Sequence, residues 1–315
     1  MLSPRALARR LGRRLVSRPR MSIVVVVHRM PDQAERTLRS LSVPYQQGVE
    51  PGDYELLVVE NRSDRPLGPE RAARAAPGAR YVHRDETRRS PVGAVNFGVT
   101  QARAPHVAVV IDGARMATPG VVRLALAAFR ADPDAVVAVP GYHLGHEPQQ
   151  DAVDNGHDEA ADAALLRSIK WPKDGYRLFE VGVFSGSSRR GFLRPQAEAN
   201  FLAVSKARWR AAGGMDPRYD DLGGGKANFD LYARLLAPPG TALYLLFGEG
   251  TFHQVHGGIT TNTPAREREP ILEAIRAQDR LIRGDAKRPP VRAHLFGVPH
   301  PAMHRFLLQS LSQTG

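Results

Sequence analysis

The sequence predicts an α/β fold with a mostly parallel sheet flanked by helices. Short, continuous apolar runs such as SIVVVV at 22–27 alternate with segments of helical spacing such as 32–41. Continuous apolar runs are typical of parallel strands that are buried on both faces. The chain has 315 residues, of which 42% are hydrophobic and 24% charged, so it can form a substantial core.

Strands and helices are expected to alternate regularly in the first half of the chain. The predicted strands are 22–27, 54–60, 79–83, 106–111 and 135–140, and the predicted helices are 32–41, 92–102 and 119–130. Thr118 and Pro119 are typical of a helix start, so we expect them to open the last of these helices. Alternation of this kind predicts right-handed crossovers between parallel strands.

The second half is expected to be less regular. Residues 141–200 are rich in Gly, His, Asp, Arg and Ser, which predicts a long, solvated and irregular segment of the kind that often carries function. Regular structure is predicted again at 200–205, 207–212, 242–247 and 264–285. We therefore expect a basic extension (1–20), a main domain (21–262, with halves 21–140 and 141–262) and a C-terminal helical arm (263–315).

The net charge of +12 is concentrated at the N-terminus. Residues 1–20 contain seven arginines and no acid, and their leucines are spaced as on one face of a helix. Three interpretations fit: an arm that contacts a membrane surface or an acidic partner, a disordered tail, or a true start at Met21. No secretory signal or membrane span is found, so we expect a cytoplasmic protein, membrane-associated at the inner face in the first interpretation. No nucleic-acid partner is expected.

Two acids follow predicted strands and are candidates for ligand binding. Glu60 ends the strand at 54–60, and Asp112 follows the strand at 106–111. Ligands of open parallel sheets bind outside the carboxyl ends of the strands, where two acids suit the base and the ribose of a nucleoside. Ordinary loop polarity is the alternative. The chain has no cysteine, so any metal must be bound by Asp, Glu, His or backbone oxygens.

The order of several motifs resembles family 2 glycosyltransferases of the GT-A fold, which is a Rossmann-like fold of nucleotide-diphospho-sugar transferases. The motifs are the apolar first strand, VVENRS at 58–63, NFGVTQARA at 96–104, VVIDG at 109–113, GGMDPRY at 213–219 and DLYARL at 230–235. The resemblance covers about residues 21–260. It implies transfer of a sugar from a nucleotide-diphospho-sugar to an acceptor that the sequence does not identify.

The resemblance also implies a donor site made by Glu60, Asn96, Asp112 and Arg115. Glu60 is expected at the base, and Asp112 at the ribose and at a metal. Arg115 has two interpretations, a surface residue or a fixed cation beside the diphosphate.

The resemblance implies a metal site as well, but the family's second metal-binding acid is Ala114 in this chain. His253 and His256 follow a predicted strand, and we expect them to complete a site with Asp112 for Mn²⁺ or Mg²⁺; structural histidines are the alternative. Imidazole ligands favour Mn²⁺.

The catalytic base is less clearly indicated. The family's base lies in an acidic pair that aligns with Ala227 and Asn228, and an amide cannot take a proton. An inverting transfer needs a carboxylate base, so Asp230 and Asp221 are the candidates, with a first-turn helix acid as the alternative role of Asp230. A retaining enzyme would need no such base. A catalytically silent sugar-nucleotide-binding protein is a second hypothesis, and a nucleotidyltransferase is a third that lacks a Gly- and Lys-bearing phosphate loop.

Overall fold

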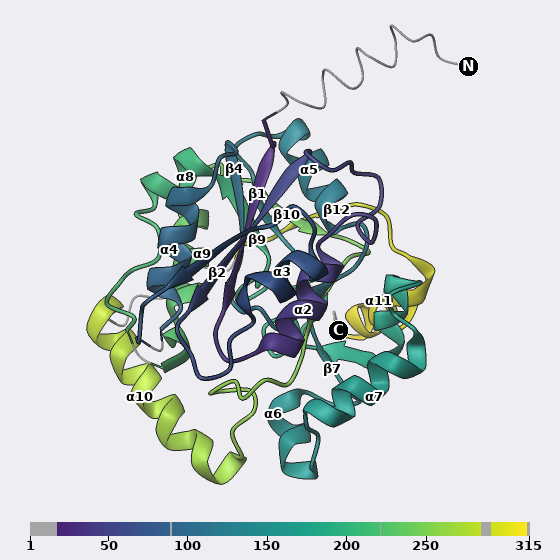
Figure 1. The fold of residues 1–315 in the computed structure, drawn as a ribbon, viewed down its shortest axis with the longest axis vertical. Helices are drawn as coiled ribbons and strands as arrows, with labels where there is room; N and C mark the ends of the chain where they lie inside the picture. Colours follow the sequence, from purple (N-terminus) through teal and green to yellow (C-terminus); the bar gives the residue numbers. More distant parts are fainter. Residues whose placement is uncertain (1–17, 89, 221, 285–290, 314–315) are drawn as a thin grey trace, which may run out of the picture.

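The protein has a central eight-stranded sheet with helices on both faces (Figure 1). This computed structural model describes residues 18–88, 90–220, 222–284 and 291–313. The strand order is β12-β10-β6-β9-β4-β1-β2-β3. All neighbouring strands are parallel except β9 (Leu202–Ser205), which is antiparallel to both β4 (His106–Val110) and β6 (Val136–Ala138). The prediction of a mostly parallel α/β sheet is confirmed.

The elements of the first half follow the predicted order. They are β1 (Met21–Val27), α2 (Pro31–Ser40), β2 (Tyr54–Asn61), α3 (Gly68–Ala75), β3 (Arg80–Arg84), α4 (Val92–Gln101), β4 and, after a short strand, α5 (Val121–Ala131). The predicted start of α5 was wrong, because its N-cap is Gly120 and the Thr118 hydroxyl donates to Glu249 instead of capping the helix.

Residues 141–200 contain regular structure, so the prediction of a long irregular segment was wrong. A second sheet has the order β5-β11-β7-β8 and combines β5 (Arg115–Ala117), β11 (Thr251–His253), β7 (Gly141–Leu144) and β8 (Gly182–Phe184). Helical segments in this region are α6 (Gln149–Ala152), η1 (Val153–Asn155), α7 (Glu159–Ile169) and η2 (Gly175–Val181). Strands of three or four residues are too short to show a hydrophobic pattern in the sequence.

The C-terminal part packs on the main sheet and contributes two strands to it, β10 and β12. Its elements are α8 (Lys206–Ala211), η3 (Leu222–Gly224), α9 (Ala227–Leu236), β10 (Leu243–Leu246), α10 (Ala265–Arg283), β12 (His294–Phe296), η4 (Pro301–Met303) and α11 (His304–Ser312). Strand β12 lies beside β10 at one edge of the sheet. No helix in the described ranges is both long and apolar enough to cross a bilayer. Most of the basic extension, residues 1–17, lies outside the described residues.

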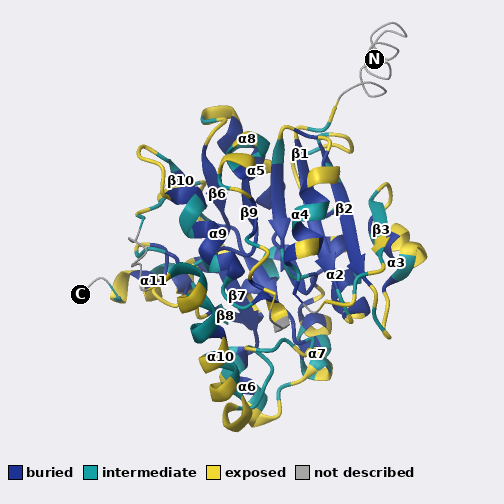
Figure 2. Cartoon of the chain, turned by 90° about the vertical axis from the view of Figure 1, so that its left-hand side faces the viewer, coloured by how far each residue is buried: buried dark blue, intermediate teal, exposed yellow. Residues whose placement is uncertain are grey.

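The two faces of β1 point into two separate hydrophobic cores, and the central strands of the sheet are buried (Figure 2). Val24 and Val26 share one core with residues of α4 and α9, whereas Val25 shares the other with residues of α2 and α5. Gly98 lets α4 lie close to the sheet, since a Cβ at this position would be 2.4 Å from Cγ1 of Val24. This double burial is why the first strand reads as a continuous apolar run.

Candidate active site

A cavity of about 560 Å³ opens at the carboxyl ends of β1 and β4. Its lining includes His28 and Asp112, which follow these two strands, and Glu198, which precedes β9. Because β9 is antiparallel to β4, the start of β9 lies at the same sheet edge as the end of β4. Two glycine-rich segments, 223–225 and 257–258, also line it. The volume is in the usual range of small-molecule sites, about 300–1,000 Å³.

Asp112, His253 and His256, which the sequence offered as metal ligands, lie together in this cavity. Oδ2 of Asp112 lies 2.9 Å from Nε2 of His253 and 3.2 Å from Nε2 of His256, and the two Nε2 atoms are 3.1 Å apart. No other group of three or more His, Asp or Glu side chains in the described part of the chain brings its ligand atoms this close together. One carboxylate and two imidazoles form a donor set that suits a first-row divalent metal.

The second sheet holds His253 in place. Strand β11 pairs His253 with Arg115 of β5 on one side and with His143 of β7 on the other. Nδ1 of His253 donates to Oε1 of Gln149, whose amide nitrogen donates to the His253 carbonyl at 3.0 Å. With the ring proton assigned to Nδ1, Nε2 of His253 is left as an acceptor that faces the Asp112 carboxylate.

Nε2 of His253 and Oδ2 of Asp112 are both acceptors and lie 2.9 Å apart, so they need a positive charge between them or a proton on one of them. Burial and the positive charge of Arg115 lower the pKa of His253 to about 4, so its imidazole is neutral at pH 7. The three ligand atoms are 2.9–3.2 Å apart, so one divalent metal could contact all three of them. The residues present therefore fit a divalent metal.

Arg115 is buried beside this cluster, and the interpretation as a surface residue was wrong. Its side chain lines the cavity, is 9% exposed, and has Nε 3.8 Å from Oδ2 of Asp112. Nε and Nη1 donate no hydrogen bond within the described chain. A buried guanidinium with unused donors is a ready partner for an anionic group in the cavity.

Ala114 faces away from the cavity. It is fully buried in the same hydrophobic cluster as Val27 and Leu38, and only its backbone contacts Asp112, with the amide 2.9 Å from Oδ1. An acid at this position would therefore not reach the cluster of Asp112 and the histidines. The residue that points into the cavity after Asp112 is Arg115.

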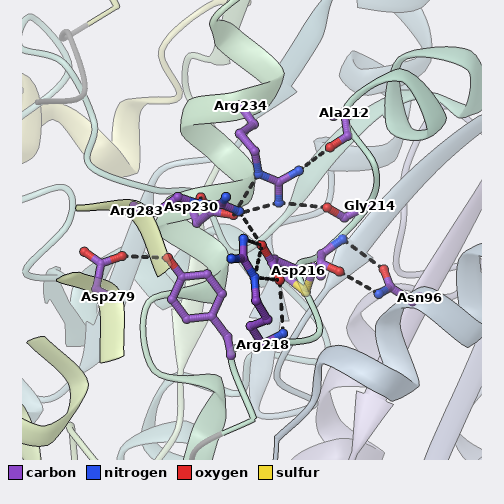
Figure 3. Close-up of polar contacts among 11 residues, drawn as sticks. Asn96, Ala212, Gly214, Asp216, Arg218, Asp230, Arg234, Asp279 and Arg283 are labelled. Carbon is purple, nitrogen blue, oxygen red and sulfur yellow. Dashed lines mark hydrogen bonds and ion pairs between the residues drawn. The ribbon is translucent and has the colours of Figure 1, made fainter. Parts of the chain in front are cut away.

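The structure places Asp230, a predicted catalytic base, in a group of ion pairs away from the cavity (Figure 3). Asp230 is 1% exposed and does not line the cavity. Its carboxylate accepts hydrogen bonds from Arg234 at 2.8 Å and from Nη2 of Arg283 at 3.0 Å, and Arg283 also contacts Asp216 at 2.6 Å. These ion pairs tie α9 to α10 and to the loop at 213–219. The other candidate, Asp221, lies outside the described residues.

Glu60 and Asn96 are not in the cavity either, although the sequence placed both at the donor site. Glu60 is fully buried and accepts hydrogen bonds from the backbone amides of Leu67 and Gly68, so it supports the start of α3. Asn96 exchanges two hydrogen bonds with the backbone of Met215, at 2.8 and 2.9 Å, and joins α4 to the loop at 213–219 (Figure 3). Both residues have structural contacts in place of the expected donor contacts.

Sequence reasoning missed Glu198 and Asn200, which line the cavity just before β9. The only signal is an acid and an amide ahead of an apolar run. That signal has meaning only when the strand is known to run antiparallel to β4, and strand direction is not visible in the hydrophobic pattern. Asn228, at the start of α9, also lines the cavity and contacts Glu198.

The chain is similar in structure to S. aureus TarS and to a mannosyltransferase. S. aureus TarS aligns over 93% of this chain and 43% of its own, with 11% identity and a TM-score of 0.51. The chain thus spans less than half of TarS, and at this identity the likeness shows the fold alone. The mannosyltransferase PcManGT from Pyrobaculum calidifontis, solved with GDP-Man and Mn²⁺, aligns over 94% of this chain and 70% of its own, with 17% identity and a TM-score of 0.47.

A family comparison of the sequence gives the more specific result. No curated protein matches the chain. The family described as "Glycosyl transferase family 2" matches residues 22–190, which is more than half of the chain and includes Asp112 and Arg115 but neither Glu198 nor the two histidines of the cavity. The chain therefore belongs to glycosyl transferase family 2 and has the GT-A fold.

Proposed function

We propose that this chain moves a sugar from a nucleotide-diphospho-sugar to an acceptor hydroxyl with the help of a divalent metal. Family membership supports glycosyl transfer, and the position of the cavity at the strand ends supports a nucleotide-type donor. The observation that carries the metal-assisted reading is the convergence of Asp112, His253 and His256 at separations of 2.9–3.2 Å. Mn²⁺ suits this mixed oxygen and imidazole set better than Mg²⁺ does.

The charges around this cluster suit a diphosphate leaving group. Asp112, His253 and His256 would hold the metal, which when bound supplies positive charge to the leaving oxygens. Arg115 adds a fixed cation at the same place, and its unused Nε and Nη1 donors are available to phosphate oxygens. Since the guanidinium is already buried, little reorganisation is needed when the diphosphate charge develops.

Release of nucleoside diphosphate from a panel of UDP- and GDP-sugars in the presence of Mn²⁺ tests this function. We expect turnover with at least one donor, a loss of turnover on chelation by EDTA, and recovery on adding Mn²⁺. Asp112→Asn should abolish the dependence on metal together with most of the turnover. Nucleotide binding without release from any donor would favour the silent binding protein, and turnover that is unaffected by EDTA would contradict the metal site.

A further inference from the structure

We propose that Glu198 is the general base that deprotonates the acceptor hydroxyl, and this role rests on the proposed function. The cavity needs such a group if transfer inverts the anomeric carbon, because the attacking hydroxyl must lose its proton. Of the two candidates from the sequence, Asp230 is held in ion pairs away from the cavity, and Asp221 lies outside the described residues.

Three carboxylates line the cavity among the described residues, and two of them are paired with histidines or with an arginine. Asp112 faces the two histidines. Glu159 lies on α7 with its side chain 40% exposed and forms a solvent-accessible ion pair with Arg65 at 3.7 Å. Glu198 is half-buried, lines the cavity and is not part of the cluster of metal-binding type. It is therefore the carboxylate placed to meet an acceptor rather than the metal.

Asn228 fixes the position of this carboxylate. Its Nδ2 donates to Oε2 of Glu198 at 2.6 Å and to the carbonyl of Ala199 at 3.0 Å, and the Asn228 side chain is buried at the start of α9. An amide cannot take a proton itself, but an amide nitrogen that donates to one carboxylate oxygen orients the whole group. Asn228 is thus a positioning residue for Glu198.

Arg115 connects the two ends of the site electrostatically. It interacts electrostatically with both Asp112 and Glu198, so the same guanidinium is near a carboxylate of the candidate metal cluster and near the proposed base. A donor whose diphosphate lies at Asp112 and Arg115 would direct its sugar into the rest of the cavity, where Glu198 and Asn228 are found.

The environment of Glu198 makes its carboxylate a stronger base. Burial raises the pKa of its carboxyl, while the Arg115 charge and the hydrogen bonds from Asn228 and Asn200 act in the opposite direction. A carboxylate whose pKa is above the usual value is a better proton acceptor.

The acceptor oxygen forms a bond to the anomeric carbon while the bond from that carbon to the diphosphate oxygen breaks, and its electron pair leaves with the diphosphate. The acceptor proton moves to Glu198, which becomes a neutral carboxylic acid and then loses the proton to solvent. The products are the glycosylated acceptor, with inverted configuration, and the nucleoside diphosphate.

The first test compares Glu198→Gln with Glu55→Gln. Glu55 is a largely buried glutamate in β2, where it accepts hydrogen bonds from Ser22 and Arg103 and does not line the cavity. Nucleoside diphosphate release is measured with the panel donor that the wild type turns over, and donor affinity with Mn²⁺ is measured by calorimetry. Glu198→Gln should lower kcat by about 10²–10⁴-fold and leave donor affinity within about twofold, whereas Glu55→Gln should keep both values.

The second test is chemical rescue by azide, a nucleophile that carries no proton. Azide should restore donor turnover in Glu198→Gln and give a glycosyl azide of inverted configuration, but it should not rescue Asp112→Asn. Turnover of Glu198→Gln within about threefold of wild type, an equal loss in Glu55→Gln, or no rescue by azide would overturn the assignment. If the wild type neither binds nor cleaves any donor, the proposed function itself fails and the role of Glu198 falls with it.

Discussion

Nε2 of His253 lies 2.9 Å from Oδ2 of Asp112, although 141 positions separate the two residues in the chain. The contact forms because β11 pairs antiparallel with β5, which begins three residues after Asp112. His253 is opposite Arg115 in this pairing, so the strand register alone brings the imidazole next to the carboxylate. The small second sheet thus assembles the candidate metal ligands at the edge of the large one.

Removing either ligand should weaken metal binding. Because Asp112 supplies the carboxylate and His253 an imidazole, Asp112→Asn and His253→Ala should each lower the affinity for Mn²⁺ by at least about tenfold. Electron paramagnetic resonance of free Mn²⁺ measures the affinity without any substrate. Asp134→Asn changes an exposed acid that pairs with Arg208 and is the control. Equal Mn²⁺ binding by all variants would show that these residues hold no metal.

An acid at position 114 should destabilise the protein and should not improve metal binding. Ala114 is buried among apolar residues, so Ala114→Asp places a carboxyl without partners in the core, and we expect the free energy of unfolding to fall by about 3 kcal/mol. Ala164→Asp, on the exposed side of α7, should cost only about 0.5 kcal/mol. Urea unfolding measures both. Tighter Mn²⁺ binding by Ala114→Asp would contradict the orientation described above.

Loss of the Asp230 carboxylate should affect stability far more than catalysis. Asp230→Asn leaves Arg234 and Arg283 without their buried partner and should lower the free energy of unfolding by about 3 kcal/mol. Turnover per folded molecule should stay within about threefold of wild type, whereas loss of a base would cost about 10²–10⁴-fold. Arg276→Gln, which removes an exposed pair with Glu269, is the stability control. A large loss of kcat with an intact fold would restore Asp230 as the base.

The stability contributed by His157 should decrease at high pH. Nε2 of His157 lies 2.7 Å from Oδ1 of the fully buried Asp162, and this hydrogen bond raises the pKa of His157 above 6.5. The charged imidazole is stabilised in the folded state, so the contribution is fully present below pH 6.5 and is lost as pH rises through the folded pKa. We expect wild type to exceed His157→Gln by about 1 kcal/mol at about pH 5.5 and by much less at about pH 9.

This pair also bears on the site, because Oδ2 of Asp162 accepts a hydrogen bond from the backbone amide of Val255 at 2.6 Å, next to His256. Urea unfolding of both proteins at the two pH values is the measurement, and nuclear magnetic resonance titration of the imidazole gives its pKa directly. If the difference in the free energy of unfolding between wild type and His157→Gln grew with pH, the predicted loss of the His157 contribution at high pH would be wrong.

Much of the fold was predictable because its strands are buried on both faces and therefore appear as continuous apolar runs. β1 and β4 are examples, and the acid that follows β4 was found for the same reason. The cluster of Asp112, His253 and His256 could be named from motif order, and its role stays a prediction. Strands β5, β7 and β11 were not foreseen, since three or four residues give no pattern and their stability comes from tertiary packing.

Glu60 and Asp230 were expected at the site but lie away from the cavity, and the two cases have one physical cause. A polar residue at the end of a strand or helix can form hydrogen bonds with several different partners. Glu60 bonds to the start of α3 and Asp230 bonds to two arginines, and nothing in the local sequence separates these outcomes from ligand binding. Glu198 was missed because its placement depends on the direction of β9.

Strand β12 has a practical consequence for anyone who shortens the chain. Residues His294–Phe296 cover the backbone of β10, which without them would present unpaired amide and carbonyl groups along an open border. A fragment that stops after α10 retains the whole candidate site, but its exposed β10 edge can pair with the β10 edge of another molecule. Self-association and precipitation of such fragments are the expected cost, so expression trials should keep the C-terminal strand even though the family match ends at residue 190.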